Sequence, residues 1–558
     1  MAKKIVPAVS QEMTADEQIQ ELVKKLMKIA DKLRGKVDAA LFKDYILGML
    51  FYRYLSEQTV EYIEEGLLSK ENRTYIDAIN DHEFNAKIAA IFEDDEKAEG
   101  FEASYSGLIK YWSISHLGYV IEPENLFSSL YERALIKATR NENPNKFSVE
   151  HLDKALKDLI KSTEGRDSEP VFHKLFNEVL TYDRLGNNPE EQSQKMGQLI
   201  VDIGQLAINV KDAKIDILGT AYMELIGQFA SSAGKKAGEF FTPVSASKLL
   251  AKLATVGLEE AKYICDPAAG SGSLLLQVNN ALPKHKVNHY YAQEYVDSTY
   301  NLLRMNLLLH KIPYAQFTVF NDDTLNHDNF YDENTGKPIN FTIQVANPPF
   351  SADWTPELGL ENDPRYKQGG LPSKQYGEMG FVEHMAYHMD DDGRIAVVLP
   401  HGVTTRNEEY RIRKYLIDKN YVDAIIGLPA NMFHTTTSAV LIMVLKKNRN
   451  GNSDNVLFIN ASKEFTKGRP KNYLTDEQID KIVQAYTDRK AVDKYSSVVP
   501  VSEIINNDYN LSVNRYADNA EEEASVNIQI KFAELKELNH KIEKSNEELL
   551  KWFGKLGL

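Results

Sequence analysis

Seven short strand-like runs alternate with helical segments between about residue 260 and residue 447. The runs are YICD, HYYAQE, FTVFND, TIQVANPPF, RIAVVLP, YVDAIIGLP and SAVLIMVLKK. Strands that alternate with helices predict an α/β fold, a mostly parallel sheet with helices on both faces. Ligands of such sheets bind beyond the carboxyl ends of the strands. The candidate functional residues are therefore expected directly after these runs.

The stretch before the sheet, from about residue 15 to residue 190, has a different pattern. Segments such as IQELVKKLMKIADKLRG and FKDYILGMLFYRYLSEQTVEYIEEGL place apolar residues three and four positions apart, which is typical of helices. No nucleophile or metal cage stands out here, so this pattern indicates an all-α packing or docking domain. We therefore expect a helical domain over residues 1–190, an α/β domain over 191–500 and a helical tail over 501–558.

The end of the chain repeats apolar residues at alternating steps of three and four, with one interruption at Ser545. Two interpretations remain open, a helix packed on its own domain and a coiled-coil-like helix for a partner chain. The polar run ADNAEEEASVN before the helix favours the partner. The apolar positions are Leu535, Leu538, Ile542, Leu549, Trp552 and Leu556.

The chain of 558 residues carries 65 Lys and Arg against 81 Asp and Glu, a formal net charge of −16. This balance argues against holding nucleic acid by bulk charge alone, because phosphate neutralisation needs clustered basic residues. A local basic groove or a partner subunit remains possible. The single cysteine, Cys265, excludes an intrachain disulfide and a cysteine-based zinc cluster, and is predicted to be a small core residue. No signal peptide and no membrane span are apparent, which predicts a cytoplasmic protein.

The segment KYICDPAAGSGSLLLQV predicts a strand, a tight turn and a helix. Gly270 and Gly272 let the backbone pass close to a ligand at the start of that helix. Leu275 replaces the third glycine of the dinucleotide pattern, which counts against NAD. Asp266 suits an amine-bearing ligand, and Glu294, 22 residues after Gly272, lies where an acid accepts hydrogen bonds from ribose.

Two further strand ends carry polar residues at the same edge of the predicted sheet. The third strand run leads into NDDTL, which contains Asp323, and the fourth leads into Asn347, Pro348, Pro349 and Phe350. Two prolines enforce an extended, rigid loop. Such a loop offers the Asn347 side-chain carbonyl and the Pro348 backbone carbonyl as acceptors, with Phe350 as a flat apolar surface. These features suit the exocyclic amine of a planar base.

Together, GEFFTP, DPAAGSG, Glu294, NDDTL and NPPF resemble the S-adenosylmethionine-dependent amino-methyltransferases of DNA, and their order resembles the gamma class. The segments DPRY, GRIAVVLPHGV, IIGLPANMFHTTT and LGMLFYRYLSE are similar to the modification (methyltransferase) subunit of type I restriction-modification systems. The resemblance covers nearly the whole chain. It implies an S-adenosylmethionine-dependent methyltransferase domain with a Rossmann-like fold.

The resemblance also implies roles for single residues. Asp266 lies near the amino group of the cofactor, Glu294 is the ribose acid, and Asp323 pairs with the cofactor adenine, although Asp322 competes for that role. Phe433 corresponds weakly to a second aromatic residue near a flipped base. The catalytic loop is Asn347, Pro348, Pro349 and Phe350. The segments that hold and wrap the cofactor are Glu239, Phe240, Phe241, Thr242, Pro243 and Val244, and Gly270, Ser271 and Gly272.

The implied reaction is methyl transfer from S-adenosylmethionine to the N6 amine of a flipped adenine. Cytosine-N4 methylation, protein-glutamine methylation and a non-catalytic scaffold are the alternatives. Cytosine-C5 methylation needs a thiolate in a Pro-Cys loop, and Cys265 does not lie in one. The implied partners are DNA, a specificity subunit bound by the C-terminal helix and N-terminal domain, and a second methyltransferase subunit. An ATP-dependent restriction subunit would be separate, because the chain has no GxxxxGK[ST] loop.

Two other features are expected to lie outside the chemistry. His384 and His388 are four residues apart, but without a metalloprotease motif or an obvious third ligand they are predicted to be ordinary core or surface histidines, and no metal is expected. The stretch from Trp354 to Gly377 is long for an ordered loop and is predicted to fold only on DNA.

Overall fold

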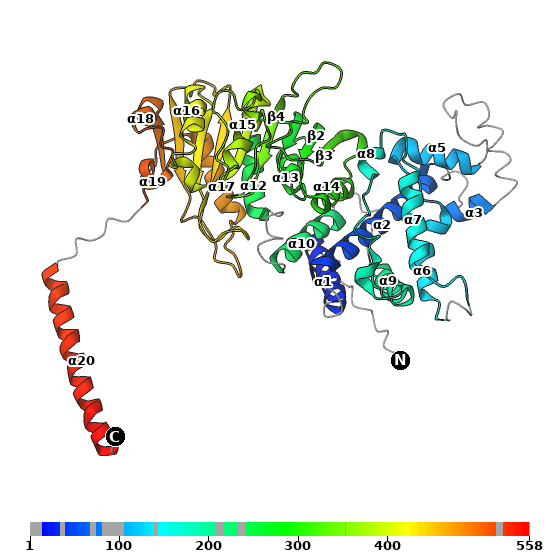
Figure 1. Cartoon of the computed structure of the whole chain (residues 1–558), viewed down its shortest axis with the longest axis horizontal. Helices are drawn as coiled ribbons and strands as arrows, with labels where there is room; N and C mark the ends of the chain where they lie inside the picture. The colour runs from blue at the N-terminus through cyan, green and yellow to red at the C-terminus, as the bar shows by residue number, and fades with distance from the viewer. Residues whose placement is uncertain are drawn as a thin grey trace, which may run out of the picture.

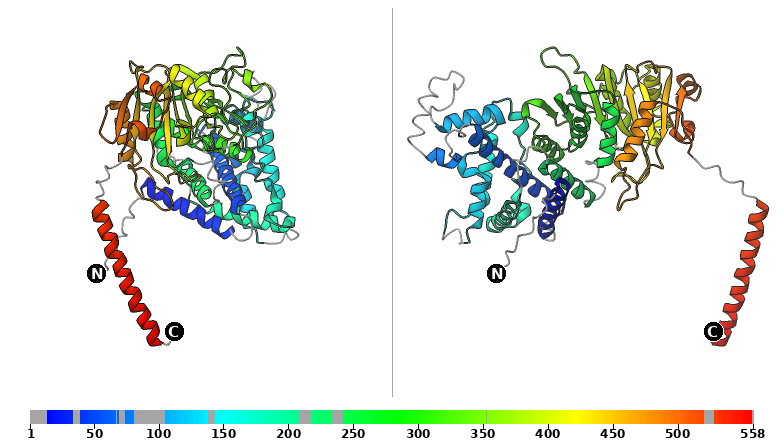
Figure 2. Two further views of the ribbon diagram at one scale, coloured as in Figure 1. Left: turned by 60° about the vertical axis from the view of Figure 1, so that its left-hand side comes forward. Right: turned by 180° about the vertical axis from the view of Figure 1, so that it is seen from behind.

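The computed structural model describes residues 14–33, 39–66, 68, 74–80, 105–137, 143–207, 217–232, 242–351, 353–519 and 528–556. They form a helical unit, a sheet unit and one long C-terminal helix. Figure 1 shows the first two side by side and the helix standing apart, and the views in Figure 2 agree. We use "helical unit" for residues 14–232 and "sheet unit" for residues 242–519.

The described residues of the helical unit contain no strand, which agrees with the predicted all-α pattern. Side chains start its helices where the sequence provides caps: Ser148 and His151 form a capping box, and Asn188 accepts a hydrogen bond from the Glu191 amide. The helices are α1 (Ala15–Leu33), α2 (Ala39–Gly66), α3 (Tyr75–Asn80), α5 (Tyr105–Leu117), α6 (Phe127–Leu135), α7 (Val149–Lys161), α8 (Glu169–Phe172), α9 (Pro189–Gly204) and α10 (Ile217–Ser232), with short 3-10 turns η2 (Pro123–Asn125) and η3 (Tyr182–Leu185).

The sheet unit contains nine strands in the order β3-β2-β1-β4-β5-β7-β6-β8-β9. The seven predicted runs are confirmed as β1 to β7, and two further strands follow them. The strand β7 is antiparallel to β5 and β6, β9 is antiparallel to β8, and the other neighbours are parallel. The strands are β1 (Ala261–Asp266), β2 (Val287–Gln293), β3 (Phe317–Phe320), β4 (Phe341–Ala346), β5 (Met389–Pro400), β6 (Val422–Gly427), β7 (Val440–Lys446), β8 (Asn455–Asn460) and β9 (Ser496–Pro500).

Helices cover both faces of this sheet, as predicted. Alternate residues of β5 divide the faces, because Ala396 and Val398 belong to one buried cluster while Ile395, Val397 and Leu399 belong to the other. The first cluster includes residues of α12 (Val244–Thr255), α13 (Ser273–Ala281), α14 (Asp297–Leu309) and α17 (Asp476–Asp488), and the second includes residues of α15 (Glu378–Tyr387), α16 (Tyr410–Asp418), α18 (Val501–Asn506) and α19 (Val513–Tyr516). Short 3-10 turns are η4 (Tyr314–Gln316), η5 (Leu360–Asn362) and η6 (His401–Thr404).

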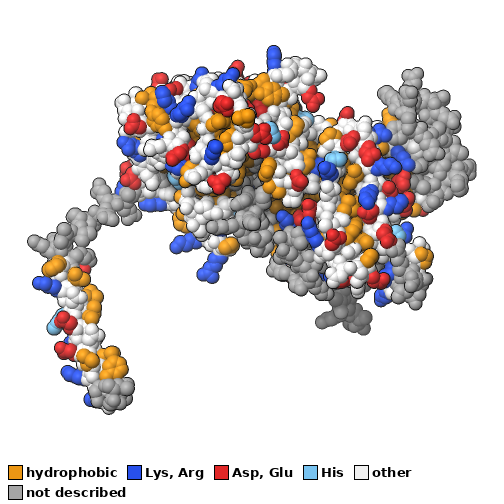
Figure 3. All heavy atoms as spheres, viewed as in Figure 1, with side chains coloured by type: hydrophobic (Ala, Val, Ile, Leu, Met, Phe, Trp, Pro, Cys, Tyr) orange, Lys and Arg blue, Asp and Glu red, His pale blue; other side chains and the backbone are white. Residues whose placement is uncertain are grey.

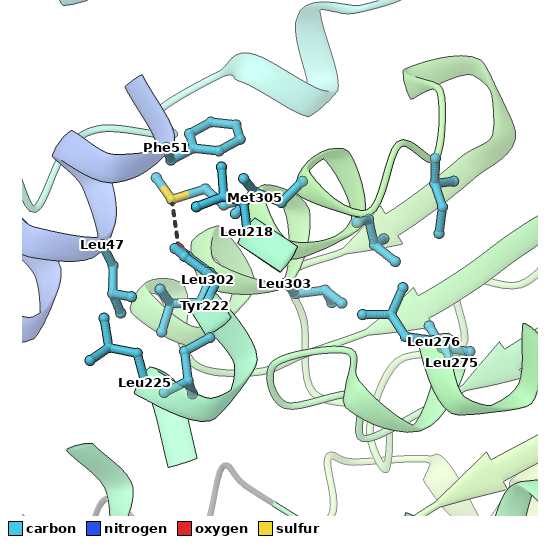
Figure 4. Close-up of a cluster of buried hydrophobic side chains, with 14 of the residues drawn as sticks. Leu47, Phe51, Leu218, Tyr222, Leu225, Leu275, Leu276, Leu302, Leu303 and Met305 are labelled. Atoms are coloured by element: carbon cyan, nitrogen blue, oxygen red, sulfur yellow. Dashed lines mark hydrogen bonds between the residues drawn. The ribbon is translucent and has the colours of Figure 1, made fainter. Parts of the chain in front are cut away.

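The two units share one hydrophobic core. Figure 4 shows side chains of α2 and α10 packed against α14, with Leu275 and Leu276 of α13 beyond Leu303, and the Tyr222 hydroxyl donates to the Met305 sulfur at 3.6 Å. The buried Arg304 guanidinium adds polar contacts, donating to backbone carbonyls of Pro170, Val171 and His173. The helices that support the loop after β1 are therefore held by the helical unit.

The C-terminal helix α20 (Ile528–Leu556) is exposed on every side that the structure describes. Phe532, Leu535, Leu538 and Trp552 are each more than half exposed. The described part of α20 is therefore not packed on its own chain, contrary to the first of the two sequence interpretations. The partner interpretation remains a proposal.

The packing moves two of the expected domain boundaries. Helix α9 packs against α6 and α2, so the helical unit continues past residue 190. Residues 501–517 pack on the sheet, where Ile504, Leu511 and Val513 are buried, so the separate tail begins later than residue 501. The three-part division itself stays a prediction. Among the described residues, no helix is long and apolar enough to cross a membrane.

Candidate active site

The loop after β1 is shaped by two glycines with positive φ. Gly270 has φ of 54° and Gly272 has φ of 80°, and Gly272 is the N-cap of α13. A Cβ on Gly272 would lie 2.5 Å from Leu303 Cδ1, so a larger residue would collide with α14. The turn and the first amides of α13 thus face the carboxyl edge of the sheet.

Asp266 ends β1 as a fully buried carboxylate. Its Oδ1 accepts a hydrogen bond from the Ala268 amide at 3.0 Å, while its Oδ2 is buried without a hydrogen-bond partner. Burial raises the pKa of Asp266 to about 8; the Ala268 bond lowers it and the nearby Glu294 carboxyl raises it further. A buried carboxylate oxygen without a donor suits an amine or ammonium group that arrives with a ligand.

Glu294 follows β2 and faces the same loop. Its Oε2 accepts from the Gly270 amide and its Oε1 from the Val296 amide, both at 2.9 Å. Burial raises its pKa, and these backbone bonds oppose that shift. Each oxygen retains acceptor capacity, so the side chain can hold the loop and also accept a ligand hydroxyl.

The two acids after β3 differ in how far neighbouring groups satisfy them. Asp322 accepts from the Asp323 amide, His327 and Asn329. Among the described residues, Asp323 accepts from the Leu325 amide at 3.0 Å and from Asn326 at 2.8 Å, and from no other group. The hydrogen bonds of Asp322 thus stabilise the turn after β3, whereas Asp323 has more acceptor capacity left for a ligand.

Arg365, in the DPRY segment, holds the loop after β3 by hydrogen bonds to its backbone. Its side chain is fully buried and donates to the Thr324 carbonyl at 2.6 Å and the Leu325 carbonyl at 3.3 Å. The Thr324 hydroxyl donates in turn to the Pro267 carbonyl at 2.6 Å. These bonds join the loops after β1 and β3. Sequence reasoning quoted DPRY only for resemblance and missed this positioning role.

The segment around DPRY is ordered by its own chain. Trp354, Leu360 and Tyr366 are buried in a small cluster, and the Trp354 indole donates to the Ser373 carbonyl at 2.8 Å. The expectation that Trp354–Gly377 folds only on DNA is therefore wrong. Its Gly, Pro and charged composition hid the apolar anchors that give it a core.

Asn347 follows β4 and leaves one acceptor open. Its Nδ2 donates to the Thr242 hydroxyl at 3.0 Å, while its Oδ1 is buried without a hydrogen-bond partner. Among the described residues, no donor bonds to the Pro348 carbonyl. Since β1 and β4 are adjacent parallel strands, Asn347 and Asp266 lie at the same sheet edge.

An aromatic pair flanks these acceptors. Phe350 is half-buried and Phe433 is buried, and their ring centroids are 6.3 Å apart. Phe433 therefore lies next to Phe350, and Phe350 has the more accessible ring. The next residue, Ser351, has φ of 52°, and its amide donates to the fully buried Glu378 carboxylate at 2.6 Å. Glu378 thus anchors the end of the loop.

Not every predicted site residue can be placed. Glu239, Phe240 and Phe241 lie outside the described residues. Pro243 is the N-cap of α12, and Val244, its first residue, is 49% exposed. The Thr242 contact with Asn347 joins this segment to the NPPF loop.

The two histidines are buried, and Cys265 is also buried as predicted. Asp328 completes a group with them that the sequence did not reveal: His388 Nε2 is 3.0 Å from both of its oxygens. However, His388 Nδ1 bonds to the Ile339 carbonyl, and Arg365 donates to His384 Nδ1 at 3.1 Å. With Nδ1 of His384 accepting, its Nε2 carries the hydrogen. Asp328 and His388 therefore form a direct hydrogen-bonded pair, whereas His384 Nε2 is buried without a hydrogen-bond partner among the described residues.

Two family models match the chain: N-6 DNA Methylase over residues 213–525 and HsdM N-terminal domain over residues 22–203. The chain belongs to the N-6 DNA methylase family. The family's reaction is transfer of a methyl group from S-adenosylmethionine to the N6 amine of adenine in DNA, and this member is of the type I modification-subunit kind.

Relatives of this N-6 DNA methylase span nearly its whole length. It is 35% identical to the type I restriction enzyme MpnII methylase subunit of Mycoplasma pneumoniae, covering 94% of this chain and 93% of that one. It is 27% identical to the MjaVII methylase subunit of Methanocaldococcus jannaschii, covering 95% and 82%. The crystal structure of the type I methyltransferase subunit from Streptococcus thermophilus, 35% identical, superposes with a TM-score of 0.75 and covers 90% of this chain and 100% of that one.

Proposed function

We propose that Asn347 and the Pro348 carbonyl accept the two amine hydrogens of a flipped adenine. The observation that carries this assignment is the buried, unpartnered Oδ1 of Asn347, whose amide nitrogen is anchored on Thr242. A free acceptor in a buried position costs free energy unless a ligand donor satisfies it. An adenine N6 amine supplies such a donor.

We assign the cofactor to the loops after β1, β2 and β3. The unpartnered Oδ2 of Asp266 fits its amino group, Glu294 fits ribose hydroxyls and Asp323 fits the adenine amine. Gly270 and Gly272, with Ser271 between them, allow the backbone of this loop to pass close to the bound cofactor. Thr242, Pro243 and Val244, together with Glu239, Phe240 and Phe241, would hold the methionine end. When bound, S-adenosylmethionine supplies an electrophilic methyl group on its sulfonium.

The chain's own residues act by positioning. The adenine amine is a poor nucleophile because its lone pair is delocalised into the ring. Acceptance of both amine hydrogens, at Asn347 and Pro348, favours a pyramidal nitrogen with a directed lone pair. Fixed acceptors in a water-poor pocket give their full effect without rearranging during the reaction.

Stacking pays part of the cost of base flipping. Extrusion of a base from the duplex costs a few kcal/mol, and aromatic stacking recovers ~1–3 kcal/mol per base. Of the two neighbouring rings, Phe350 is the more accessible. Pro349, which is exposed, keeps the loop extended.

The decisive experiment is Asn347→Ala. We expect cofactor affinity within about twofold of wild type by calorimetry, because the cofactor loops are untouched. Methyl transfer should fall by about 10²–10³-fold, the loss typical when one preorganised polar group is removed from a reacting centre. Thr242→Val removes the hydroxyl that anchors the Asn347 amide but keeps the Oδ1 acceptor, so methyl transfer should fall by less than in Asn347→Ala. Because Thr242 also lies in the proposed cofactor segment, its cofactor affinity is measured alongside. Wild-type turnover in Asn347→Ala would sink the assignment.

The acceptor is tested separately. Labelled methyl groups should enter DNA and not protein when both are offered, and mapping should find N6-methyladenine rather than N4-methylcytosine. Transfer to protein glutamine would support the alternative enzyme. Failure to bind S-adenosylmethionine would support a non-catalytic scaffold.

We also propose that α20, with the helical unit, binds a specificity subunit that supplies much of the DNA grip. Contiguous exposed apolar side chains on α20, among them Phe532, Leu535, Leu538 and Ile542, are typical of a protein-binding surface. The net charge of −16 means that a partner with basic residues would strengthen binding to DNA. A second methyltransferase subunit and a separate restriction subunit complete the proposed complex. Leu538→Glu with Ile542→Glu should abolish co-purification with the specificity subunit. His540→Glu with Lys541→Glu on the same helix is the control that should retain it.

A further inference from the structure

A short hairpin between β8 and α17 is unusually basic for this acidic chain. It spans residues 466–473, TKGRPKNY, with three cations and no acid. Its ends are closed by two backbone bonds between Thr466 and Tyr473, at 2.9 and 3.1 Å. A Cβ on Gly468 would lie 2.2 Å from the Lys471 carbonyl oxygen, so the tip is a tight turn that requires glycine.

The hairpin is hydrogen-bonded to the loop that carries Phe433. The Asn472 amide donates to the Asn431 carbonyl at 2.9 Å, and its side chain donates to the Ala430 carbonyl at 3.0 Å. Phe433 lies two residues beyond Asn431 and contacts Phe350 of the catalytic loop. The hairpin is therefore held beside the proposed base pocket by a short chain of direct contacts.

Its three cations have different surroundings. Lys471 is half-buried and donates to the Asn431 side chain at 3.2 Å and the Thr436 carbonyl at 3.3 Å, and burial lowers its pKa. Lys467 and Arg469 are exposed, and no acid of the described chain pairs with either. Figure 3 shows Lys and Arg side chains projecting from the lower edge of the sheet unit. Lys471 thus anchors the hairpin, while Lys467 and Arg469 remain available to a partner.

A cavity of about 430 Å³ connects this hairpin with the cofactor segment. Its walls include Arg469 and Tyr473 on the hairpin side and Pro243 and Val244 at the start of α12. Tyr473 is 45% exposed, so the hairpin that carries the two exposed cations also presents an accessible aromatic ring. Cations next to an exposed aromatic ring are a combination that binds a nucleic-acid strand.

We propose that Lys467 and Arg469 bind phosphates of the DNA strand beside the flipped base. This inference rests on the proposed function, which supplies DNA as the substrate. The chain has an overall charge of −16, and the two exposed cations without an acidic partner among the described residues give a polyanion a local point of contact next to the proposed base pocket. The contacts are to the backbone and carry no sequence preference, which leaves base reading to another subunit.

The test is the salt dependence of DNA binding by the full chain. A labelled 30-base-pair duplex of mixed sequence is titrated by fluorescence anisotropy over a range of potassium chloride concentrations. Loss of two phosphate contacts in Lys467→Gln/Arg469→Gln should make the slope of log K against log salt about 1.8 shallower, since each contact contributes ~0.9. Affinity at moderate salt should fall by about tenfold. An unchanged slope would overturn the proposal.

Matched variants separate charge from folding. Lys490→Gln/Lys494→Gln removes two exposed cations beyond the other end of α17 and should leave the slope unchanged. Lys467→Arg/Arg469→Lys retains the charge and should retain the slope. Cofactor affinity should be equal in all variants. A hairpin that instead binds a subunit would show lost co-purification with an unchanged slope, which counts against the proposal. The slope reports the hairpin, whereas turnover of Asn347→Ala reports the proposed function, so the two can fail separately.

Discussion

Asp266 and Asp423 are two buried carboxylates of one sheet with opposite surroundings. Asp266, at the end of β1, has one oxygen without a partner, and burial raises its pKa to about 8. Asp423, in β6, lies among cations: Arg489 at 3.0 Å, Arg449 at 3.3 Å and Lys446 at 3.5 Å. Burial alone would raise its pKa, but these cations outweigh it, and the pKa of Asp423 is lowered.

This contrast supports our proposal that Asp266 binds a ligand, whereas Asp423 has a structural role. Asp423 also accepts from the Tyr486 hydroxyl at 2.7 Å, so both of its oxygens are satisfied inside the chain. Asp266 has an oxygen without a hydrogen-bond donor at the carboxyl edge of the sheet, where ligands of parallel sheets bind. A buried polar group without a partner is costly, and functional sites are where such costs persist.

The largest expected effect is on folding. Asp423→Ala leaves Lys446, Arg449 and Arg489 facing one another in a buried site without a counter-ion. We expect a loss of about 3–5 kcal/mol in the free energy of unfolding, measured by urea titration. Asp266→Asn is the comparison variant and should change stability by less than about 1 kcal/mol without ligand. Equal losses in the two variants would break the distinction.

The next effect is on the cofactor. Asp266→Asn removes the negative charge that we assign to the cofactor amine, and hydrogen bonds to charged groups contribute ~1.5–3 kcal/mol. S-adenosylmethionine affinity should therefore fall by about 10–100-fold by calorimetry. Because Asp266 is largely protonated at neutral pH before binding, wild type should also release protons, which comparison of two buffers detects. The assignment would be rejected if Asp266→Asn bound S-adenosylmethionine as tightly as wild type and wild type released no protons on binding.

The two acids should also give opposite pH dependences of stability. The pKa of Asp266 is higher in the folded chain than in the unfolded chain, so its contribution is complete at low pH and is lost as pH rises through about 8. The pKa of Asp423 is lower in the folded chain, so its contribution is present above the unfolded value of about 3.9 and is lost as pH falls through the folded value. Urea titrations of wild type, Asp266→Asn and Asp423→Asn across pH would separate the two contributions. The prediction would be contradicted if both variants changed the pH profile of stability in the same direction.

The smallest effect concerns a positioning residue. Glu378 resembles Asp266 in being buried with one oxygen that has no hydrogen-bond partner, and its Oε1 accepts a hydrogen bond from the Ser351 amide at the end of the NPPF loop. Glu378→Ala should lower kcat by about three- to tenfold with cofactor affinity retained, since one hydrogen bond contributes ~0.5–1.5 kcal/mol. Glu378→Gln keeps an acceptor for that amide and should recover part of the rate. A loss of cofactor affinity instead would place Glu378 with the ligand-binding acids.

Much of the sheet and its edge could be predicted, because strand ends carry their polar residues with them. Asp266, Glu294, Asp323 and Asn347 each follow a predicted strand, and the structure brings them to one edge. The antiparallel position of β7 between β5 and β6 was not predicted, because an apolar run does not indicate whether its strand is parallel or antiparallel to its neighbours. The short edge strand β9 was also missed, because it mixes two serines with two valines and ends in proline.

Contacts across long sequence distances escaped prediction for a different reason. His388 and Asp328 are 60 residues apart, and only the fold brings them together. Likewise, nothing local distinguishes Arg365 from a surface arginine, although it holds backbone carbonyls after β3. Such positions carry no periodicity or motif of their own.

The core shared by the helical unit and α14 affects how the chain folds during synthesis. Helices α2 and α10 leave the ribosome before α14, yet Phe51, Leu218 and Tyr222 pack against side chains of that later helix. The nascent helical unit therefore carries an uncovered apolar side until residues 297–309 have been made. We expect a truncated product that stops before these residues to keep this side exposed and to aggregate, and we expect the two units of the full chain to unfold together.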